Sequence, residues 1–218
     1  MNNNFLMLDI ETTGIDPKVE DLLQIGMLEM IWEGDHYRDG KSVCLHQFSN
    51  RAPISDFARE HQQRLYTVCN GTVLVKPEEL RKRVLEFAKA CGFIPPNLKL
   101  AGWNAAVFDV PFLVDKGVLR PSRYTAVKEQ EHRVGDFHYR VYDVQSVLQF
   151  VMNIHNTGSK DKIAQLIKEL SENSVYHAAL PPGAVHDALW DCYNQLNYLN
   201  DLLALIRPLS DGGHDAAR

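Results

Sequence analysis

Three apolar segments near the N-terminus have the length and composition of β-strands. They cover residues 5–11, 22–32 and 42–48, and a Gly-Asp pair at residues 34–35 marks a turn between the second and the third. Glycine and aspartate at such a position favour a hairpin. We therefore predict that the three segments form an antiparallel meander.

The rest of the chain alternates between helical and strand patterns. Apolar side chains recur at helical spacing after Pro77, whose ring suits a first helical turn, and this pattern stops at Gly92. This order of elements predicts an α/β protein with a mixed five-stranded sheet flanked by helices. The elements expected after the meander are strands over residues 98–103 and 139–144, and helices over or around residues 77–91, 110–116, 147–151, 163–170 and 189–206.

The length of 218 residues suits one globular domain, which we expect over residues 1–207, followed by a disordered tail over residues 208–218. No apolar run approaches the roughly 18 residues of a membrane-spanning helix. The four cysteines are widely scattered, without the spacing of a zinc site or of a compact disulfide framework. We therefore expect a cytoplasmic protein that has no membrane partner.

Asp9 and Glu11 stand two residues apart in the first expected strand. Side chains at this spacing leave a strand on the same side, so both carboxylates project together. A divalent cation relieves their repulsion and the cost of burying them, because hard cations bind carboxylate oxygens. The alternative is that both acids lie in water at the end of a strand.

Two further acids and a histidine occupy comparable positions. Asp109 follows the strand expected at residues 98–103 and precedes a helix, where aspartate commonly serves as a cap. Asp191 lies early in the last helix, beside its apolar stripe, and His186 lies at or just before that helix. A lone histidine there is more often structural than catalytic, but beside several acids it can serve as a general base.

Metal-assisted hydrolysis of a phosphodiester needs this combination of residues. Two divalent ions about 4 Å apart activate water and stabilise the leaving oxygen. A carboxylate site favours Mg²⁺ or Mn²⁺ over zinc, and histidine titrates near neutral pH. Because the formal net charge is −5, the whole molecule does not attract nucleic acid, and contact must be local or helped by bound metal.

These motifs resemble those of the DEDDh family of 3′–5′ exonucleases, which have a ribonuclease H-like fold. Residues 9–14 (DIETTG) resemble the first motif and residues 104–109 (NAAVFD) the second. Residues 186–191 (HDALWD) resemble the third, with the histidine five positions before the aspartate. The motifs occur in the family's order, and by element order the resemblance covers about residues 5–206.

The resemblance implies a role for each motif residue. The acids would bind two Mg²⁺ or Mn²⁺ ions, and the histidine would be the general base at the 3′ end of a single-stranded nucleic acid. The implied catalytic residues are Asp9, Glu11, Asp109, His186 and Asp191, of which the four acids are the metal ligands. Thr12 and Thr13 would lie beside the terminal nucleotide, and Asn104 would contact substrate or hold the second motif in place.

A narrower similarity, to oligoribonucleases, rests on residues 13–17 (TGIDP) and 137–144 (FHYRVYDV). In that subfamily the second segment makes dimer contacts and grips a 5′ phosphate. Arg140 would then bind a phosphate and the chain would form a homodimer. Gln145 departs from the serine of that subfamily, and the Asn and Phe-Asp form of the second motif is that of proofreading and general exonucleases, so the subfamily stays open.

The leading hypothesis is a metal-dependent 3′–5′ exonuclease that releases nucleoside 5′-monophosphates from single-stranded DNA or RNA. One alternative is an oligoribonuclease that acts on short RNA or dinucleotides, and another is a non-catalytic docking module. Ile15 and Phe57 either sandwich a base, since ring stacking tolerates any base, or are ordinary apolar residues.

Overall fold

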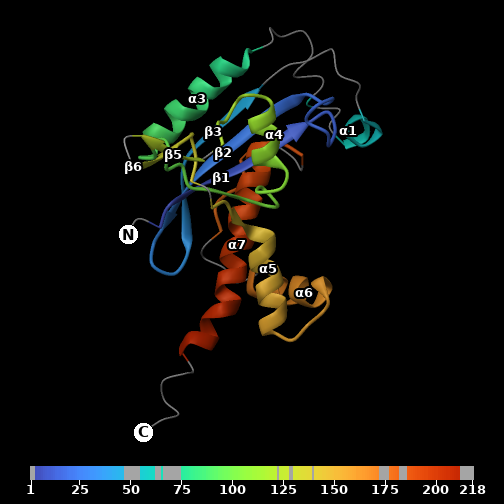
Figure 1. Ribbon diagram of the computed structural model, residues 1–218. Helices are drawn as coiled ribbons and strands as arrows, with labels where there is room; N and C mark the ends of the chain where they lie inside the picture. The colour runs from blue at the N-terminus through green and yellow to red at the C-terminus, as the bar shows by residue number, and fades with distance from the viewer. Residues whose placement is uncertain are drawn as a thin grey trace.

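A computed structural model of the chain describes residues 3–46, 55–61, 65, 75–121, 123–127, 130–138, 140–171, 177–181 and 186–211. Its centre is a five-stranded sheet in the order β3-β2-β1-β4-β7 (Figure 1). The first three strands pair antiparallel, whereas β4 and β7 join the sheet parallel. The predicted meander and mixed sheet are therefore confirmed. The strands are β1 (Phe5–Thr12), β2 (Leu22–Trp32), β3 (Tyr37–His46), β4 (Leu100–Gly102) and β7 (Tyr142–Asp143).

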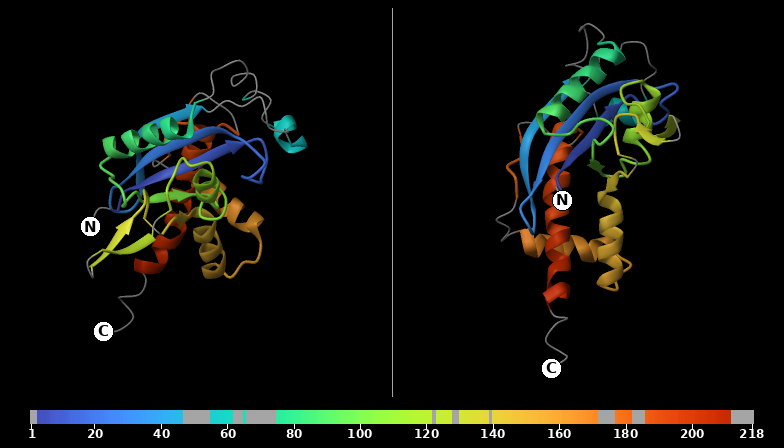
Figure 2. Two further views of the ribbon diagram at one scale, coloured as in Figure 1. Left: turned by 45° about the horizontal axis from the view of Figure 1, so that its top comes forward. Right: turned by 60° about the vertical axis from the view of Figure 1, so that its left-hand side comes forward.

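Helices cover both faces of the sheet. Helices α3 and α4 pack on one face, whereas α7 packs on the other, and α5 and α6 pack against α7 (Figures 1 and 2). The helices are α1 (Asp56–His61), α3 (Pro77–Ala90), α4 (Asp109–Asp115), α5 (Val144–Ile154), α6 (Lys160–Ser171) and α7 (Ala188–Asp211). No helix within these described ranges is long and apolar enough to span a membrane.

The alternation of side chains along β1 divides the core into two clusters. Leu6, Leu8 and Ile10 lie in the cluster with α3 and α4. Met7, one residue earlier, lies in the cluster with α5, α6 and α7. Asp9 and Glu11 continue the odd-numbered series, so their side chains leave β1 on the side of α7.

The start of α7 lies directly against β2. Gly26 permits this approach, because a Cβ atom at this position would lie 2.3 Å from the carbonyl carbon and oxygen of Ala188. The buried Gln24 adds a hydrogen bond, since its Oε1 accepts from the backbone N–H of Ala188 at 2.6 Å. Strand β2 therefore determines where the third sequence motif enters its helix.

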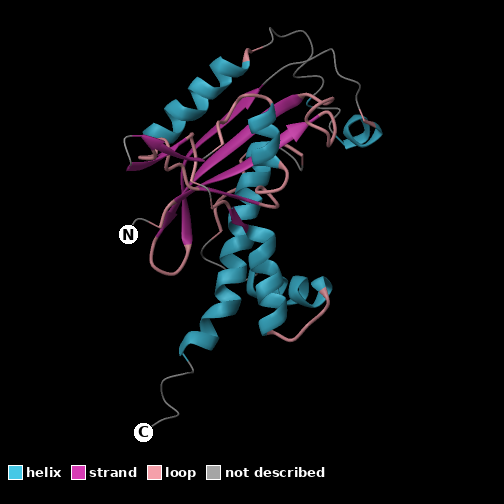
Figure 3. Ribbon diagram, in the orientation of Figure 1, coloured by secondary structure: helices cyan, strands magenta, loops and turns pink. Residues whose placement is uncertain are grey.

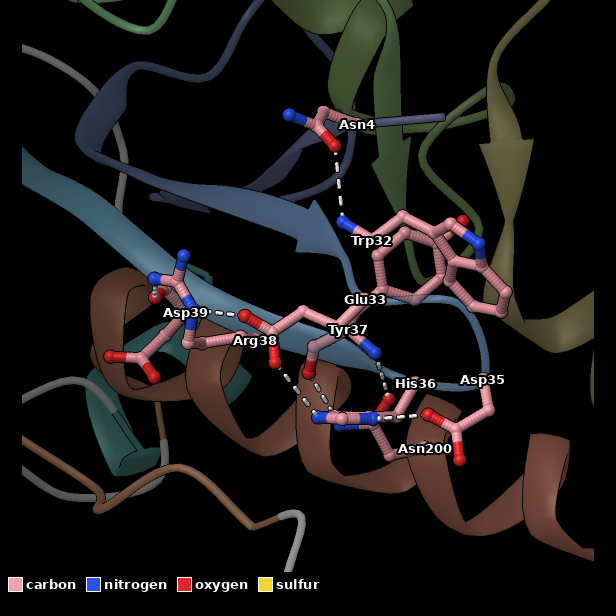
Figure 4. Close-up of polar contacts among 9 residues, drawn as sticks. All are labelled: Asn4, Trp32, Glu33, Asp35, His36, Tyr37, Arg38, Asp39 and Asn200. Carbon is pink, nitrogen blue, oxygen red and sulfur yellow. Dashed lines mark hydrogen bonds and ion pairs between the residues drawn. The ribbon is translucent and has the colours of Figure 1, made fainter. Parts of the chain in front are cut away.

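The turn between β2 and β3 lies at the predicted Gly-Asp pair, but β3 begins at Tyr37 rather than at residue 42. The side chain of Asn200 on α7 fixes this point. Its Oδ1 accepts from the backbone N–H of Tyr37 and its Nδ2 donates to the carbonyl of Tyr37, both at 2.8 Å (Figure 4). A strand end that is set by a residue on another element is invisible to a local sequence pattern.

Two further boundaries differ from the prediction (Figure 3). Strand β7 covers Tyr142–Asp143 alone, because Asp143 accepts from the backbone N–H of Gln145 and thereby caps α5. Helix α7 continues to Asp211, so residues 208–211 of the expected tail are helical, and residues 212–218 lie outside the described ranges. The hairpin of β5 (Arg123–Val127) and β6 (Gln130–Val134) was not predicted.

Candidate active site

A cavity of about 530 Å³ opens where β1, α4 and α7 meet. The three sequence motifs, which are far apart in the chain, all contribute to its wall. The wall contains the five residues expected to be catalytic, namely Asp9, Glu11, Asp109, His186 and Asp191. The remaining lining residues are Ile10, Trp103, Phe108, Asn194, Gln195 and Tyr198. The fold thus brings together the acids and the histidine, while their chemical roles stay predictions.

Asp109 is held against the edge of β1. The pairing of β1 with β4 ends at Met7. Farther along the strand, the backbone N–H of Ile10 donates to Asp109 Oδ1 at 3.0 Å. The capping role is not observed, because Phe108 occupies the N-cap position of α4. Asp109 therefore lies beside β1, beyond its pairing with β4, with 4% of its surface exposed.

Three of the four acids in the cavity resist ionisation. Loss of hydration raises the pKa of Asp9 well above its usual value, and the nearby carboxylates of Asp109 and Glu11 add to the shift. Loss of hydration also raises the pKa of Asp109 to about 7, although backbone hydrogen bonds oppose the shift. The pKa of Asp191 is raised for the same reason. A divalent cation would favour the ionised form of all these groups.

His186 is placed by a backbone conformation that few residues other than glycine adopt. Its φ angle is +66°, and such a conformation costs on the order of 1 kcal/mol. The backbone N–H of His186 donates to Asp191 Oδ2 at 3.0 Å, which helps to offset this cost. Ligand atoms of Glu11, His186 and Asp191 lie within 4.8 Å of one another. These three side chains are therefore close enough to share one ion.

The two threonines of the first motif lie outside the cavity wall. Thr12 Oγ1 donates to the carbonyl oxygen of Gly14 at 2.6 Å, and Thr13 Oγ1 donates to Glu20 Oε2 at 2.6 Å. Both threonines are buried. Their hydroxyl groups thus shape the loop that follows β1, and their contact with a terminal nucleotide stays a prediction.

Asn104 and Arg140 also lie outside the cavity wall. Asn104 has a φ angle of +58°, and its backbone N–H donates to Asp143 Oδ1 at 2.8 Å, which ties the second motif to the start of α5. Arg140 is exposed, and its backbone N–H donates to His138 Nδ1 at 3.1 Å. Ile15 is 85% exposed, whereas the side chain of Phe57 lies outside the described part of the structure.

Several lining residues were not predicted from the sequence. Asn194, Gln195 and Tyr198 follow Asp191 by three, four and seven positions, which places them on one face of α7. That spacing is the signal that would have identified them. Trp103 follows β4, and its ring packs edge-on against Tyr198 with 5.6 Å between the ring centroids. These two aromatic rings therefore line the same cavity as the acids.

No family model and no curated protein matches the sequence, but solved structures match its fold. The zinc-bound complex of E. coli ExoI with single-stranded DNA superimposes with a TM-score of 0.58 at 11% identity, over 97% of this chain and 42% of that one. Cell-death related nuclease 4 superimposes with a TM-score of 0.59 at 14% identity, over 95% of this chain and 64% of that one. The nuclease domain of 3′hExo, a DEDDh family member bound to rAMP, superimposes with a TM-score of 0.56 at 12% identity, over 97% of this chain and 94% of that one.

The chain shares the fold of these nuclease structures, of which 3′hExo is a DEDDh family member. The ribonuclease H-like architecture expected from the motifs is thereby confirmed. The chain spans less than half of the E. coli ExoI chain and about two thirds of cell-death related nuclease 4. At these identities the likeness concerns the fold, so the chemistry must be argued from the residues in the cavity.

Proposed function

We propose that this chain is a metal-dependent 3′–5′ exonuclease that hydrolyses single-stranded DNA or RNA to nucleoside 5′-monophosphates. The observation that carries the proposal is that all five motif residues line one cavity. Likeness to a complex with single-stranded DNA and to a nuclease domain bound to rAMP supports it. The 3′–5′ polarity rests on the motif resemblance.

The donor set fits Mg²⁺ or Mn²⁺. Asp9, Glu11, Asp109 and Asp191 would hold two such ions, because hard cations bind carboxylate oxygens and would offset the raised pKa values of Asp9, Asp109 and Asp191. Bound ions of this kind supply charge stabilisation to the attacking and leaving oxygens of the phosphodiester.

The protein's own residues would orient the reactants and move the proton. An imidazole nitrogen of His186 accepts the proton of the attacking water. The backbone N–H of His186 donates to Asp191 Oδ2, which ties the backbone of this histidine to one of the acids. Trp103 and Tyr198 offer ring surfaces to the terminal nucleoside, and such surfaces accept any base.

The test is a nuclease assay on 5′-labelled oligonucleotides with Mg²⁺ or Mn²⁺. We expect stepwise shortening from the 3′ end that EDTA stops, and loss of this activity in Asp9→Ala. The variant His186→Ala should keep Mn²⁺ binding and lose about 10²–10⁴-fold in turnover. Absence of metal-dependent trimming would refute the exonuclease and leave the non-catalytic docking module. Full activity in Asp9→Ala would refute the proposed site.

The substrate class needs a separate comparison. Rates on a dinucleotide, a longer RNA and a longer DNA distinguish an oligoribonuclease from a general exonuclease, since the former works fastest on the dinucleotide. A homodimer through residues 137–142 would accompany the oligoribonuclease. A monomeric mass in solution would count against that dimer.

A further inference from the structure

Helix α7 carries a buried amide, Gln195, that connects Asp9 to the end of β4. Gln195 Nε2 donates to Asp9 Oδ1 at 2.8 Å, and Gln195 Oε1 accepts from the backbone N–H of Trp103 at 2.9 Å. Gln195 is 8% exposed and lines the cavity. Both polar ends of this side chain are therefore bonded within the protein.

The backbone determines which way the amide points. A backbone N–H can only donate, so the N–H of Trp103 requires the amide oxygen of Gln195 on its side. The NH₂ group must then face Asp9. A flipped amide would turn its NH₂ group toward the N–H of Trp103, so that donor faced donor. Its oxygen would then face the carboxylate of Asp9, so that acceptor faced acceptor. The donor that reaches Asp9 is therefore fixed in direction by the end of β4.

The effect of this donor concerns one of the proposed metal ligands. A hydrogen bond to Oδ1 restricts rotation of the Asp9 carboxylate, and outer hydrogen bonds of this kind orient carboxylates that bind metals. The same bond lowers the pKa of Asp9, against the upward shift caused by burial. Gln195 also lies one helical turn after Asp191, so one helix carries a proposed ligand and the residue that holds another.

We propose that Gln195 is a positioning residue, which holds the Asp9 carboxylate in the orientation that binds the divalent ion. The inference rests on the proposed function, in which Asp9 is a metal ligand. Gln195 would not touch the reacting atoms. It would act through Asp9, and α7, β1 and β4 would keep their relative positions around the cavity through its two hydrogen bonds.

The main test measures Mn²⁺ affinity by calorimetry on the metal-free full chain. Gln195→Met keeps the length of the side chain and removes both hydrogen bonds. We expect the Kd for Mn²⁺ to rise by about 10–100-fold. The matched control is Asn200→Met on the same helix, which removes two bonds to the backbone of Tyr37. The control should lower the melting temperature and leave the Kd for Mn²⁺ unchanged.

The outcomes separate this inference from the proposed function. If wild type binds Mn²⁺ and Asp9→Ala does not, the metal site stands. An unchanged Kd in Gln195→Met, or an equal rise in Asn200→Met, then overturns the positioning role alone. If Asp9→Ala binds Mn²⁺ as wild type does, the proposed metal site itself fails, and the role of Gln195 fails with it.

A second variant covers the case in which Gln195→Met does not fold. Gln195→Glu keeps an oxygen for the N–H of Trp103 and replaces the donor that faces Asp9 with an acceptor. We expect kcat to fall about 10-fold or more with little change in KM. Asn200→Asp, the matched amide-to-acid change, should keep wild-type kcat. Wild-type kcat in Gln195→Glu would overturn the positioning role.

Discussion

The protein buries carboxylates in two different ways. Asp136 is 1% exposed, and it accepts hydrogen bonds from Arg81 Nε at 3.0 Å and from the backbone N–H of Arg120 at 2.9 Å. Asp109 is nearly as buried, but it bonds to the backbone N–H of Ile10, which carries no charge. One acid is neutralised inside the fold, whereas the other lies among further acids.

The difference shows what distinguishes a structural acid from a candidate ligand. A buried ion pair balances its charge with a fixed guanidinium and therefore joins two elements, here α3 and the segment after β6. Asp109 lies in a cavity with Asp9 and Asp191, and its pKa rises to about 7. Burial alone therefore does not indicate a site, whereas burial beside like charges does.

Replacing each acid with its amide should have the largest effects. Asp109→Asn should lower nuclease turnover by about 10²–10³-fold or more. The same change should raise the free energy of unfolding of the metal-free protein at pH 8, because it removes a charge that folding withdraws from water. Asp136→Asn should do the reverse and destabilise the fold. Urea unfolding in EDTA and the nuclease assay measure both quantities, and destabilisation by Asp109→Asn would contradict the comparison.

Removal of the guanidinium is the next test. Arg81→Met should lower the free energy of unfolding by about 3–5 kcal/mol, because it leaves Asp136 buried without its cation. The matched control is Arg83→Met on the same helix, which breaks a solvent-facing pair with Glu79 and should cost less than about 1 kcal/mol. Equal losses in the free energy of unfolding would show that the buried pair of Arg81 and Asp136 stabilises the fold no more than the exposed pair does.

The pH dependence follows from the raised pKa of Asp109. Its carboxyl has a usual pKa of 3.8 and a folded pKa of about 7, so the folded state keeps a proton that the unfolded state loses across this range. The free energy of unfolding of the metal-free protein should therefore fall between about pH 4 and 7, by on the order of 1–3 kcal/mol. Mn²⁺ should reduce this fall. A rise over the same range in EDTA would contradict the assignment.

The two kinds of buried acid were not equally predictable from the sequence. Asp9 and Glu11 stood out because strand alternation places both on one face, and short motifs supplied their partners. The ion pair of Asp136 with Arg81 joins residues 55 positions apart, and it depends on how α3 packs. Gln195 was missed because an amide has no marked chemistry until its neighbours are known.

The hairpin of β5 and β6 was missed for a related reason. Its strands, Arg123–Val127 and Gln130–Val134, are rich in polar residues and pair with each other outside the main sheet. A local apolar pattern identifies strands that enter a core. It therefore detected β1 and β2, whose side chains are nearly all buried, and it did not detect this hairpin.

Asp201 is a buried acid whose surroundings are intermediate between those of Asp136 and Asp109. Loss of its partner should have the smallest effect on the free energy of unfolding. Asp201 Oδ1 lies 2.8 Å from His177 Nε2, and the His177 side chain is 30% exposed. Burial raises the pKa of Asp201, and the hydrogen bond from His177 opposes the shift. His177→Ala should cost about 1 kcal/mol in urea unfolding, less than Arg81→Met, because water can reach the vacated space.

The control for this pair is His36→Ala in the turn between β2 and β3. His36 Nδ1 lies 2.6 Å from Asp35 Oδ1, and His36 Nε2 lies 3.5 Å from Glu33 Oε2 (Figure 4). Both acids are well exposed. Its removal should cost less than about 0.5 kcal/mol, because water solvates exposed carboxylates. A loss of about 3 kcal/mol or more in His177→Ala would instead group Asp201 with Asp136, as an acid whose burial depends fully on its partner.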